Sequence, residues 1–167
     1  MKIPDYVLVC MQTDRAWPPM KYAAACSVYR QKLVEMGIVE GCDIWRYFFG
    51  SINERVKCNE TAMRFQVSLN GVLELSFSHY VKIPADEKMR NLEQKWITAR
   101  FTGVESLDCL LTTNTMNFRD LWHVGFWHRK GVKHAFFDFS TEDGKISRVM
   151  FTFEDVEFVE NASGINQ

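Results

Sequence analysis

The sequence predicts an α+β domain in which a strongly curved antiparallel sheet carries three helices packed on one side. Three observations lead to this class. Apolar residues recur at helical spacing in residues 20–49, they alternate with polar residues in residues 63–77, and strand-like runs fill residues 104–159. Residues 1–167 suit a single domain because no Pro-, Gly- or Ser-rich linker divides them, and residues 161–167 form a polar tail.

The first helix is predicted over residues 20–36, where apolar side chains recur every three or four positions. These side chains are Tyr22, Cys26, Tyr29, Leu33 and Met36. Pro19 suits the first turn of a helix, and Gly37 suits its C-terminal cap. The preceding residues 6–10 fit either a short strand or a segment packed across the core.

Two further helices complete the helical layer. One is predicted over residues 42–49, with three side chains on its buried side: Ile44, Trp45 and Phe48. The other begins at Asp86, which can cap a helix, and ends before Gly103. The side chains that define its helical spacing are Met89, Leu92, Glu93 and Trp96.

The first hairpin turns at Asn70-Gly71, between two segments of alternating apolar and polar residues. A two-residue loop would place apolar Val67 opposite Glu74. A three-residue loop that ends with Gly71 in the left-handed conformation instead places Val67 opposite Leu73. The sequence therefore predicts the three-residue loop, in which a type I turn is followed by a G1 bulge.

Four antiparallel strands are predicted from residue 104 onward. Two longer strands cover residues 104–118 and 121–128, and Lys130-Gly131 turns the chain into a hairpin over residues 133–153. One face of that hairpin collects its apolar residues: Ala135, Phe137, Phe139, Val149, Phe151 and Phe153. Burying each Phe is worth roughly 1.5–3 kcal/mol, so this face must be covered.

The last strand changes phase near its middle. Apolar residues occupy odd positions as far as Phe153, whereas Val156 and Phe158 are even. Because a slip of one residue moves side chains to the opposite face, we expect a bulge or bend at Glu154 and Asp155. Strongly curved sheets need such irregularities.

Composition and motifs exclude several classes of protein. The net charge is −1, from 20 basic and 21 acidic residues, so the basic excess of a nucleic-acid-binding surface is absent. No apolar run reaches about 18 residues, and residues 1–6 lack the apolar core of a signal peptide. We therefore expect an intracellular protein that binds neither nucleic acid nor membrane directly. No phosphate-binding, dinucleotide-binding, serine-nucleophile or zinc-protease motif occurs, and we expect no cofactor.

The cysteines are odd in number and include no C-x-x-C pair. They are Cys10, Cys26, Cys42, Cys58 and Cys109, and the first four are spaced by 16 residues. No other residue repeats with them, so we interpret this spacing as coincidence. Free thiols in a reducing compartment are the expected state. The ligand spacing of a zinc site is missing.

Histidine chemistry is the alternative to a purely structural role. The histidines are His79, His123, His128 and His134, and their spacings match no standard metal motif. His134 and Asp138 form a candidate general acid–base pair, because positions four apart on a strand share a face. The favoured interpretation is that both are polar surface residues. On that interpretation the chain has no catalytic residues and no metal site.

Large apolar residues also occur at positions that do not match the core-facing set. Trp122, Phe126 and Phe136 are even, whereas the core-facing hairpin residues are odd, and Met150 is likewise even. A sheet with two apolar faces needs a second cover, and a partner subunit is the simplest one. We therefore predict a homodimer whose interface contains Trp122, Phe126, Phe136 and Met150.

Four segments carry a resemblance to a known family: Cys42-Asp-Ile-Trp-Arg-Tyr-Phe48, Tyr80-Val-Lys-Ile-Pro84, residues 101–111 and residues 142–155. Together with the order of elements, they resemble the nuclear-transport-factor-2-like superfamily. Within it they are most similar to the dimerisation domain of the LIM-domain-binding (Chip/SEUSS) adaptors. The likeness runs in order over residues 25–159. The chain departs from the family in lacking a LIM-interaction tail.

This resemblance implies a cone-shaped fold, a homodimer joined through the sheet or its helices, and no catalytic residues. The function expected is a non-enzymatic dimerisation or scaffold module of a regulatory, transcription-associated assembly, with other regulatory proteins as further partners. The location would be nuclear for an adaptor and cytoplasmic otherwise. The alternative is a cone-fold protein that binds an apolar small molecule, or an enzyme of dehydratase, isomerase or cyclase type. A polar-lined cavity with a histidine beside a carboxylate would favour the enzyme, and an interior filled with Phe, Met and Leu would favour the module.

Overall fold

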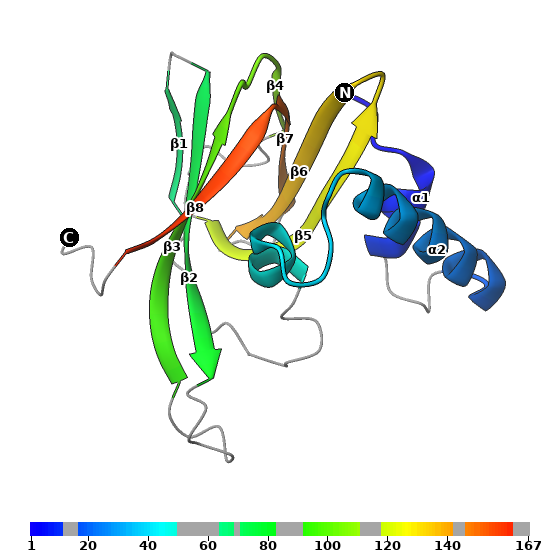
Figure 1. Ribbon diagram of the computed structural model, residues 1–167, viewed down its shortest axis with the longest axis horizontal. Helices are drawn as coiled ribbons and strands as arrows, with labels where there is room; N and C mark the ends of the chain where they lie inside the picture. The colour runs from blue at the N-terminus through cyan, green and yellow to red at the C-terminus, as the bar shows by residue number, and fades with distance from the viewer. Residues whose placement is uncertain are drawn as a thin grey trace.

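The computed structural model describes residues 1–11, 17–49, 64–68, 71–82, 92–110, 118–141 and 146–161. In these residues the chain is a mixture of helices and antiparallel strands, which confirms the α+β class (Figure 1). The elements are α1 (Asp5–Met11), α2 (Pro19–Glu35), the π-helical turn η2 (Trp45–Phe49), β1 (Arg64–Ser68), β2 (Val72–Lys82), β3 (Leu92–Thr102), β4 (Leu107–Leu110), β5 (Phe118–Arg129), β6 (Val132–Thr141), β7 (Ile146–Phe153) and β8 (Asp155–Asn161).

The described strands form two sheets. Sheet A has the order β1-β2-β3-β8, and sheet B has the order β4-β7-β6-β5, with antiparallel pairing throughout. Figure 1 shows η2 in front of the space between the sheets, while α1 and α2 lie beside β5. The three helical elements are thus gathered toward sheet B and the space between the sheets.

The two sheets are joined by one nearly continuous strand. β7 ends at Phe153 in sheet B, the chain bends at Glu154, and β8 begins at Asp155 in sheet A. Phe153 is buried, and beyond the bend the even-numbered Val156 and Phe158 pack against the core. The predicted bend at Glu154 and Asp155 is confirmed, because the strand changes sheets there and its core-facing parity changes with it.

The register of the first hairpin is confirmed. Val67 is opposite Leu73 and Phe65 is opposite Leu75, as the three-residue loop requires. Gly71 has φ +74°, in the left-handed region where a side chain would be strained. The register therefore aligns positions 65 and 67 of β1 with the buried Leu75 and Leu73 of β2.

Helix α2 and its predicted cap are also confirmed. The chain leaves the helix in a Schellman motif, in which the Ile38 N–H donates to the Leu33 carbonyl at 2.8 Å. Gly37 provides the left-handed residue of this motif, with φ +76°. Leu33 and Ile38 are both buried, so the cap also fixes the direction of the chain that leads to η2.

The predicted third helix is wrong where the structure describes it. Leu92–Thr102 is strand β3, and Asp86 and Met89 lie outside the described residues. Leu92 and Trp96 have helical spacing, but further along the strand the buried residues recur at every second position. Ile97, Ala99 and Phe101 are all 0 % exposed, and polar residues stand between them. β3 pairs with both β2 and β8, so its backbone is satisfied on both edges.

Three other predicted elements have different bounds or types. Residues 5–11 form helix α1 and not a strand. Of the strand predicted over residues 104–118, only Leu107–Leu110 and Phe118 are strand, and residues 111–117 lie outside the described part. In the predicted helix over residues 42–49, the chain widens into the π-helical η2.

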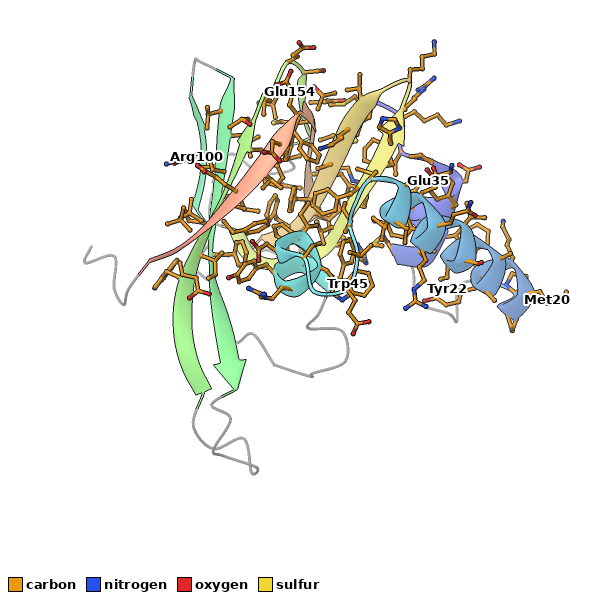
Figure 2. The ribbon with its side chains drawn as sticks, in the orientation of Figure 1. Met20, Tyr22, Glu35, Trp45, Arg100 and Glu154 are labelled. Atoms are coloured by element: carbon orange, nitrogen blue, oxygen red, sulfur yellow. The ribbon has the colours of Figure 1, made fainter. Side chains whose placement is uncertain are left out.

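The interior between the sheets is filled with aromatic rings. All six core-facing residues predicted for the last hairpin are at most 3 % exposed, which confirms that face. From η2, Phe48 reaches the rings of Phe77 in sheet A and Phe137 in sheet B, at centroid distances of 5.5 and 5.3 Å. Phe101 lies 4.8 Å from Phe151 across the same space. Figure 2 shows side chains filling the space behind η2, with Trp45 beside η2 on the side toward α2.

Candidate functional site

The candidate site lies on the face of sheet B that points away from sheet A, here called the outer face of sheet B. Arg129 is opposite Val132, so the β5–β6 turn contains two residues and pairs odd positions of β5 with even positions of β6 over residues 123–129. Between β6 and β7, even positions pair with even positions. The described side chains on the outer face include Asp108, His123, Trp127, His134, Phe136, Asp138, Ile146, Arg148, Met150 and Thr152.

The prediction that Phe126 is an interface residue is wrong. Phe126 is 0 % exposed and faces the interior, where its ring lies 5.8 Å from that of Phe48 and 6.0 Å from that of Phe153. Phe126 faces inward because the two-residue turn pairs even positions of β5 with odd positions of β6. Phe126 is therefore opposite the core residue Ala135. The backbone N–H of Phe126 donates to the Tyr29 hydroxyl at 3.0 Å, so α2 also covers this edge of sheet B.

Phe136 does lie on the outer face, but the chain itself buries it to 0 % exposure. It is opposite Gly125, and a Cβ on Gly125 would overlap the Phe136 ring and approach Cγ1 of Val7 to 2.9 Å. Val7 belongs to α1, so the N-terminal segment, residues 1–11, packs on the face that a partner subunit was expected to cover. The prediction that Phe136 contacts a second copy is therefore wrong, because the N-terminal segment of the same chain covers it.

The N-terminal segment reaches across the outer face of sheet B. Its α-amino group donates to Asp108 Oδ2 on β4 at 3.0 Å, and Val7 packs beside β5. Ile3 is 5 % exposed. Of the other two predicted interface residues, Met150 is half-buried on this face opposite Asp108, and the side chain of Trp122 lies outside the described residues.

A charge cluster built around the buried Asp138 occupies the centre of the outer face. Asp138 is 2 % exposed, and Arg148 donates to both of its carboxylate oxygens, at 2.6 and 2.7 Å. Nδ1 of His123 lies 3.4 Å from Oδ2 of the same carboxylate. Burial alone would raise the pKa of Asp138, but the hydrogen bonds from Arg148 and His123 outweigh it and lower the pKa. Arg148 also lies over the ring of Phe136, 5.1 Å from its centroid.

The predicted pair of His134 with Asp138 is not formed. Positions four apart on a strand share a face but are separated by about 13 Å, so the cross-strand neighbours Arg148 and His123 take the carboxylate. His134 stacks on Trp127, with ring centroids 5.0 Å apart and planes inclined by 8°. Burial lowers the pKa of His134, and the positive charges of Arg129, His128 and the N-terminus lower it further.

The cluster favours a fixed charge over acid–base chemistry. Both oxygens of Asp138 are held by a guanidinium, and the lowered pKa keeps the carboxylate ionised. A general base must reach substrate, whereas Asp138 is 2 % exposed and both of its oxygens already accept hydrogen bonds from Arg148. In the part of the chain that the structure describes, no group of three or more His, Cys, Asp or Glu side chains is placed to hold a metal ion.

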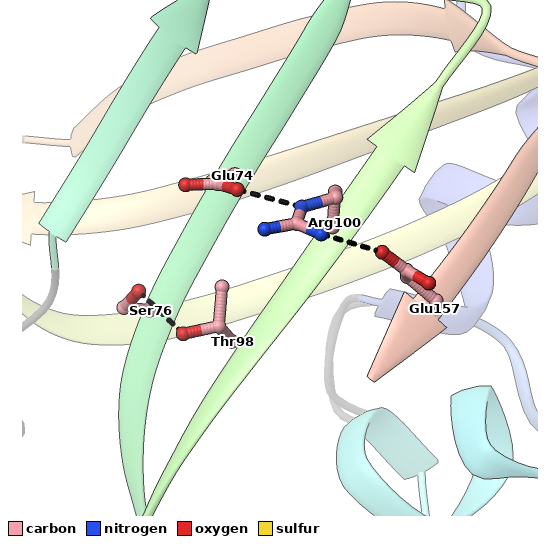
Figure 3. Close-up of polar contacts among 5 residues, drawn as sticks. All are labelled: Glu74, Ser76, Thr98, Arg100 and Glu157. Carbon is pink, nitrogen blue, oxygen red and sulfur yellow. Dashed lines mark hydrogen bonds and ion pairs between the residues drawn. The ribbon is translucent and has the colours of Figure 1, made fainter. Parts of the chain in front are cut away.

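The outer face of sheet A is different in character. Arg100 on β3 bridges Glu74 on β2 and Glu157 on β8, at 2.7 and 2.8 Å (Figure 3). Beside it, the hydroxyls of Ser76 and Thr98 lie 2.9 Å apart. This row of polar groups is typical of a sheet face in contact with water.

A pair of thiols was missed by the sequence reasoning. Sγ of Cys10 on α1 lies 3.2 Å from Sγ of Cys26 on α2. The two cysteines are 16 residues apart, so the spacing that was interpreted as coincidence includes one real contact. Cys42 lines a different pocket, next to Ile44 and Phe153, so the spacing does not extend to a third thiol. Two adjacent amphipathic helices, each with a cysteine, would have been the signal.

Comparisons with protein-family models, with curated proteins and with solved structures find no match to this chain. Among the described residues, no helix is long and apolar enough to cross a membrane.

Proposed function

We propose that the chain is a non-enzymatic dimerisation module, of the cone-shaped nuclear-transport-factor-2-like type, in a regulatory, transcription-associated assembly. The observation that carries this proposal is the aromatic filling between the sheets. Phe137 alone lies 5.8 Å from Phe151, 5.9 Å from Phe101 and 6.1 Å from Phe126 by ring centroids. A substrate cavity in a cone-fold enzyme would need that space.

The described pockets do not offer an enzymatic site in its place. One of about 260 Å³ lies between the α2–η2 connection and the β7–β8 bend, and another of about 290 Å³ lies between α1, α2 and η2. Neither is lined by a histidine. Among the described residues, His123 contacts the carboxylate of Asp138 on the outer face of sheet B, where Arg148 already neutralises that carboxylate.

The outer face of sheet B is the better candidate for the dimer contact. Along β7, Ile146 is 40 % exposed and Met150 is half-buried on the same face, with Arg148 between them. Apolar side chains beside an arginine are the composition that protein interfaces favour. A two-fold dimer would use this patch, Ile146, Arg148 and Met150, on both subunits.

The test compares charge substitutions on the two outer faces. Ile146→Lys and Met150→Lys should each give a folded monomer, because a lysine in a self-complementary patch meets its own copy. Val159→Lys is the matched control, since Val159 is 42 % exposed and lies opposite Thr98 on sheet A. Sedimentation measures mass, and circular dichroism confirms folding. A wild-type chain that remains monomeric at high concentration, or a dimer that Val159→Lys breaks and Ile146→Lys does not, contradicts the proposal.

A further inference from the structure

Two thiols lie within reach of each other and of solvent. Sγ of Cys10 and Sγ of Cys26 are 3.2 Å apart, on neighbouring helices α1 and α2. Both residues are half-buried and line the pocket of about 290 Å³, together with Met11, Tyr29 and Arg30. A small thiol-reactive molecule that enters this pocket therefore meets both sulfur atoms, and the guanidinium of Arg30 favours one that carries negative charge.

The approach needed for a bond is short. A disulfide places its sulfur atoms about 2.05 Å apart, so the two thiols must close by roughly 1.2 Å. Rotation about the side-chain bonds and a small shift of α1 provide this distance. α1 has only seven residues, and so short a helix depends on its packing for stability, which makes it the element that moves.

We propose that Cys10 and Cys26 are a redox modification site, at which a low-molecular-weight disulfide such as glutathione disulfide converts the two thiols into a reversible bond between α1 and α2. Formation of this bond does not require a dimer, because both thiols belong to one chain. Burial, with Cys26 as the next cause, raises the pKa of Cys10 to about 12, so Cys10 is protonated at neutral pH, and we assign the first attack to Cys26.

The exchange is balanced in two steps. The Cys26 thiolate attacks one sulfur of the reagent, which breaks the reagent's S–S bond, forms a mixed disulfide and releases one thiolate. The Cys10 thiol then transfers its proton to that thiolate, and its sulfur attacks Sγ of Cys26. The second half of the reagent leaves as a thiolate and takes up the proton that Cys26 had released to water. The protein loses two electrons and two protons, and the reagent becomes two thiols.

The bond would hold the N-terminal segment on sheet B. α1 carries Val7, which packs where Gly125 faces Phe136. Cys10 is one residue from the end of α1, so a bond to α2 fixes that end of the helix. A link between positions 16 residues apart also restricts the chain whenever α1 detaches, which favours its return. Oxidation therefore keeps the outer face of sheet B covered, and reduction allows α1 to open.

The first experiment identifies the bond. The full chain is equilibrated with glutathione disulfide, alkylated, digested with trypsin and analysed by mass spectrometry. The expected product joins the peptide of residues 3–15 to that of residues 22–30 and is two hydrogen atoms lighter than their sum. Cys109 is the internal control, because this exposed thiol should form only a mixed disulfide with glutathione. Glutathione adducts on Cys10 or Cys26 without the joined peptide, or pairing of either with another cysteine, would overturn the proposal.

The second experiment measures the structural effect. Hydrogen exchange of the α1 amides, Asp5–Met11, should slow by about tenfold or more on oxidation of the wild-type chain. The variant Cys26→Ser, treated in the same way, should show no change, which separates the bond from any effect of the oxidant elsewhere. Equal protection of α1 in the oxidised and reduced wild type would contradict the role given to the bond.

Discussion

The outer faces of the two sheets differ in their contact with water. Sheet A presents hydroxyls and the exposed ion pairs of Arg100 with Glu74 and Glu157. Sheet B carries Phe136 at 0 % exposure under the N-terminal segment, beside the buried Asp138 and its half-buried partner Arg148. One face is in contact with water, whereas much of the other is a second core.

The difference follows from the residue types at the alternate positions of each strand that face outward. On β3, Thr98 and Arg100 alternate with the core residues, so a single apolar face results. On β6, the outward positions include Phe136 as well as Asp138, so both faces need cover. A charge placed under such a cover must be paired, because removing a carboxylate from water is costly unless hydrogen bonds replace the water. The same alternation therefore predicts an exposed face in one sheet and a covered face in the other.

The largest expected effect comes from breaking the ion pair of the covered face. Arg148→Ala leaves Asp138 buried without its main partner and should lower the free energy of unfolding by about 3 kcal/mol, measured by urea denaturation. Arg100→Ala is the matched change on sheet A. It should have little effect, because exposed ion pairs are screened by water.

A double variant distinguishes loss of the pair from loss of packing. Arg148→Met combined with Asp138→Leu removes both charges at similar volume, so it should recover most of the stability that Arg148→Ala loses. Comparable losses from Arg148→Ala and Arg100→Ala would show that the two faces do not differ in the way described. A double variant as unstable as the single one would assign the loss to packing over Phe136.

The next effect comes from separating the cover from the sheet. Gly125→Ala places a methyl group against the Phe136 ring and Val7, so it should lower the free energy of unfolding by about 1–3 kcal/mol. Faster hydrogen exchange in α1 should accompany the loss. On sheet A, Ser76→Ala removes one partly exposed hydrogen bond to Thr98 and should cost about 1 kcal/mol or less. If α1 exchanges at the wild-type rate in Gly125→Ala, the N-terminal segment is not held by that contact.

Local patterns in the sequence predicted the features that depend on a few neighbouring residues, such as turns, caps and the bend. Gly71 and the alternation around it gave the hairpin register, and Gly37 gave the end of α2, because each requires a left-handed residue at one position. The bend at Glu154 followed from a change of parity within one strand. The third helix failed because the spacing of Leu92 and Trp96 fits a helix, while the pairing of β3 with two neighbours decides the structure.

The candidate site needed information that no single segment carries. Which face Phe126 occupies depends on the length of the β5–β6 turn, since each added residue reverses the parity of the partner strand. Asp138 met Arg148 and His123 through pairing across strands, not with His134 along one strand. The cover on Phe136 and the contact between Cys10 and Cys26 both depend on where α1 docks.

The smallest expected effect is a pH dependence that arises on the covered face. Burial lowers the pKa of His134, as do the nearby charges of Arg129, His128 and the N-terminus, so the folded chain holds this imidazole neutral. The unfolded chain takes up a proton below about pH 6.5, which favours unfolding. Stability should therefore be fully present above about pH 6.5 and decline as the pH falls from there through the lowered pKa of folded His134.

Urea denaturation between pH 5 and 8 measures this decline, and His134→Gln should flatten it because the titrating group is gone. Titration of Asp138 does not contribute to the decline in stability between pH 5 and 8. Its pKa is lowered, so its contribution stays intact across that window and is lost only below about pH 4. Trp127 stacks on His134 and should report the same protonation through its fluorescence. A wild-type decline that persists in His134→Gln would place the titrating group elsewhere and remove this distinction between the two sheets.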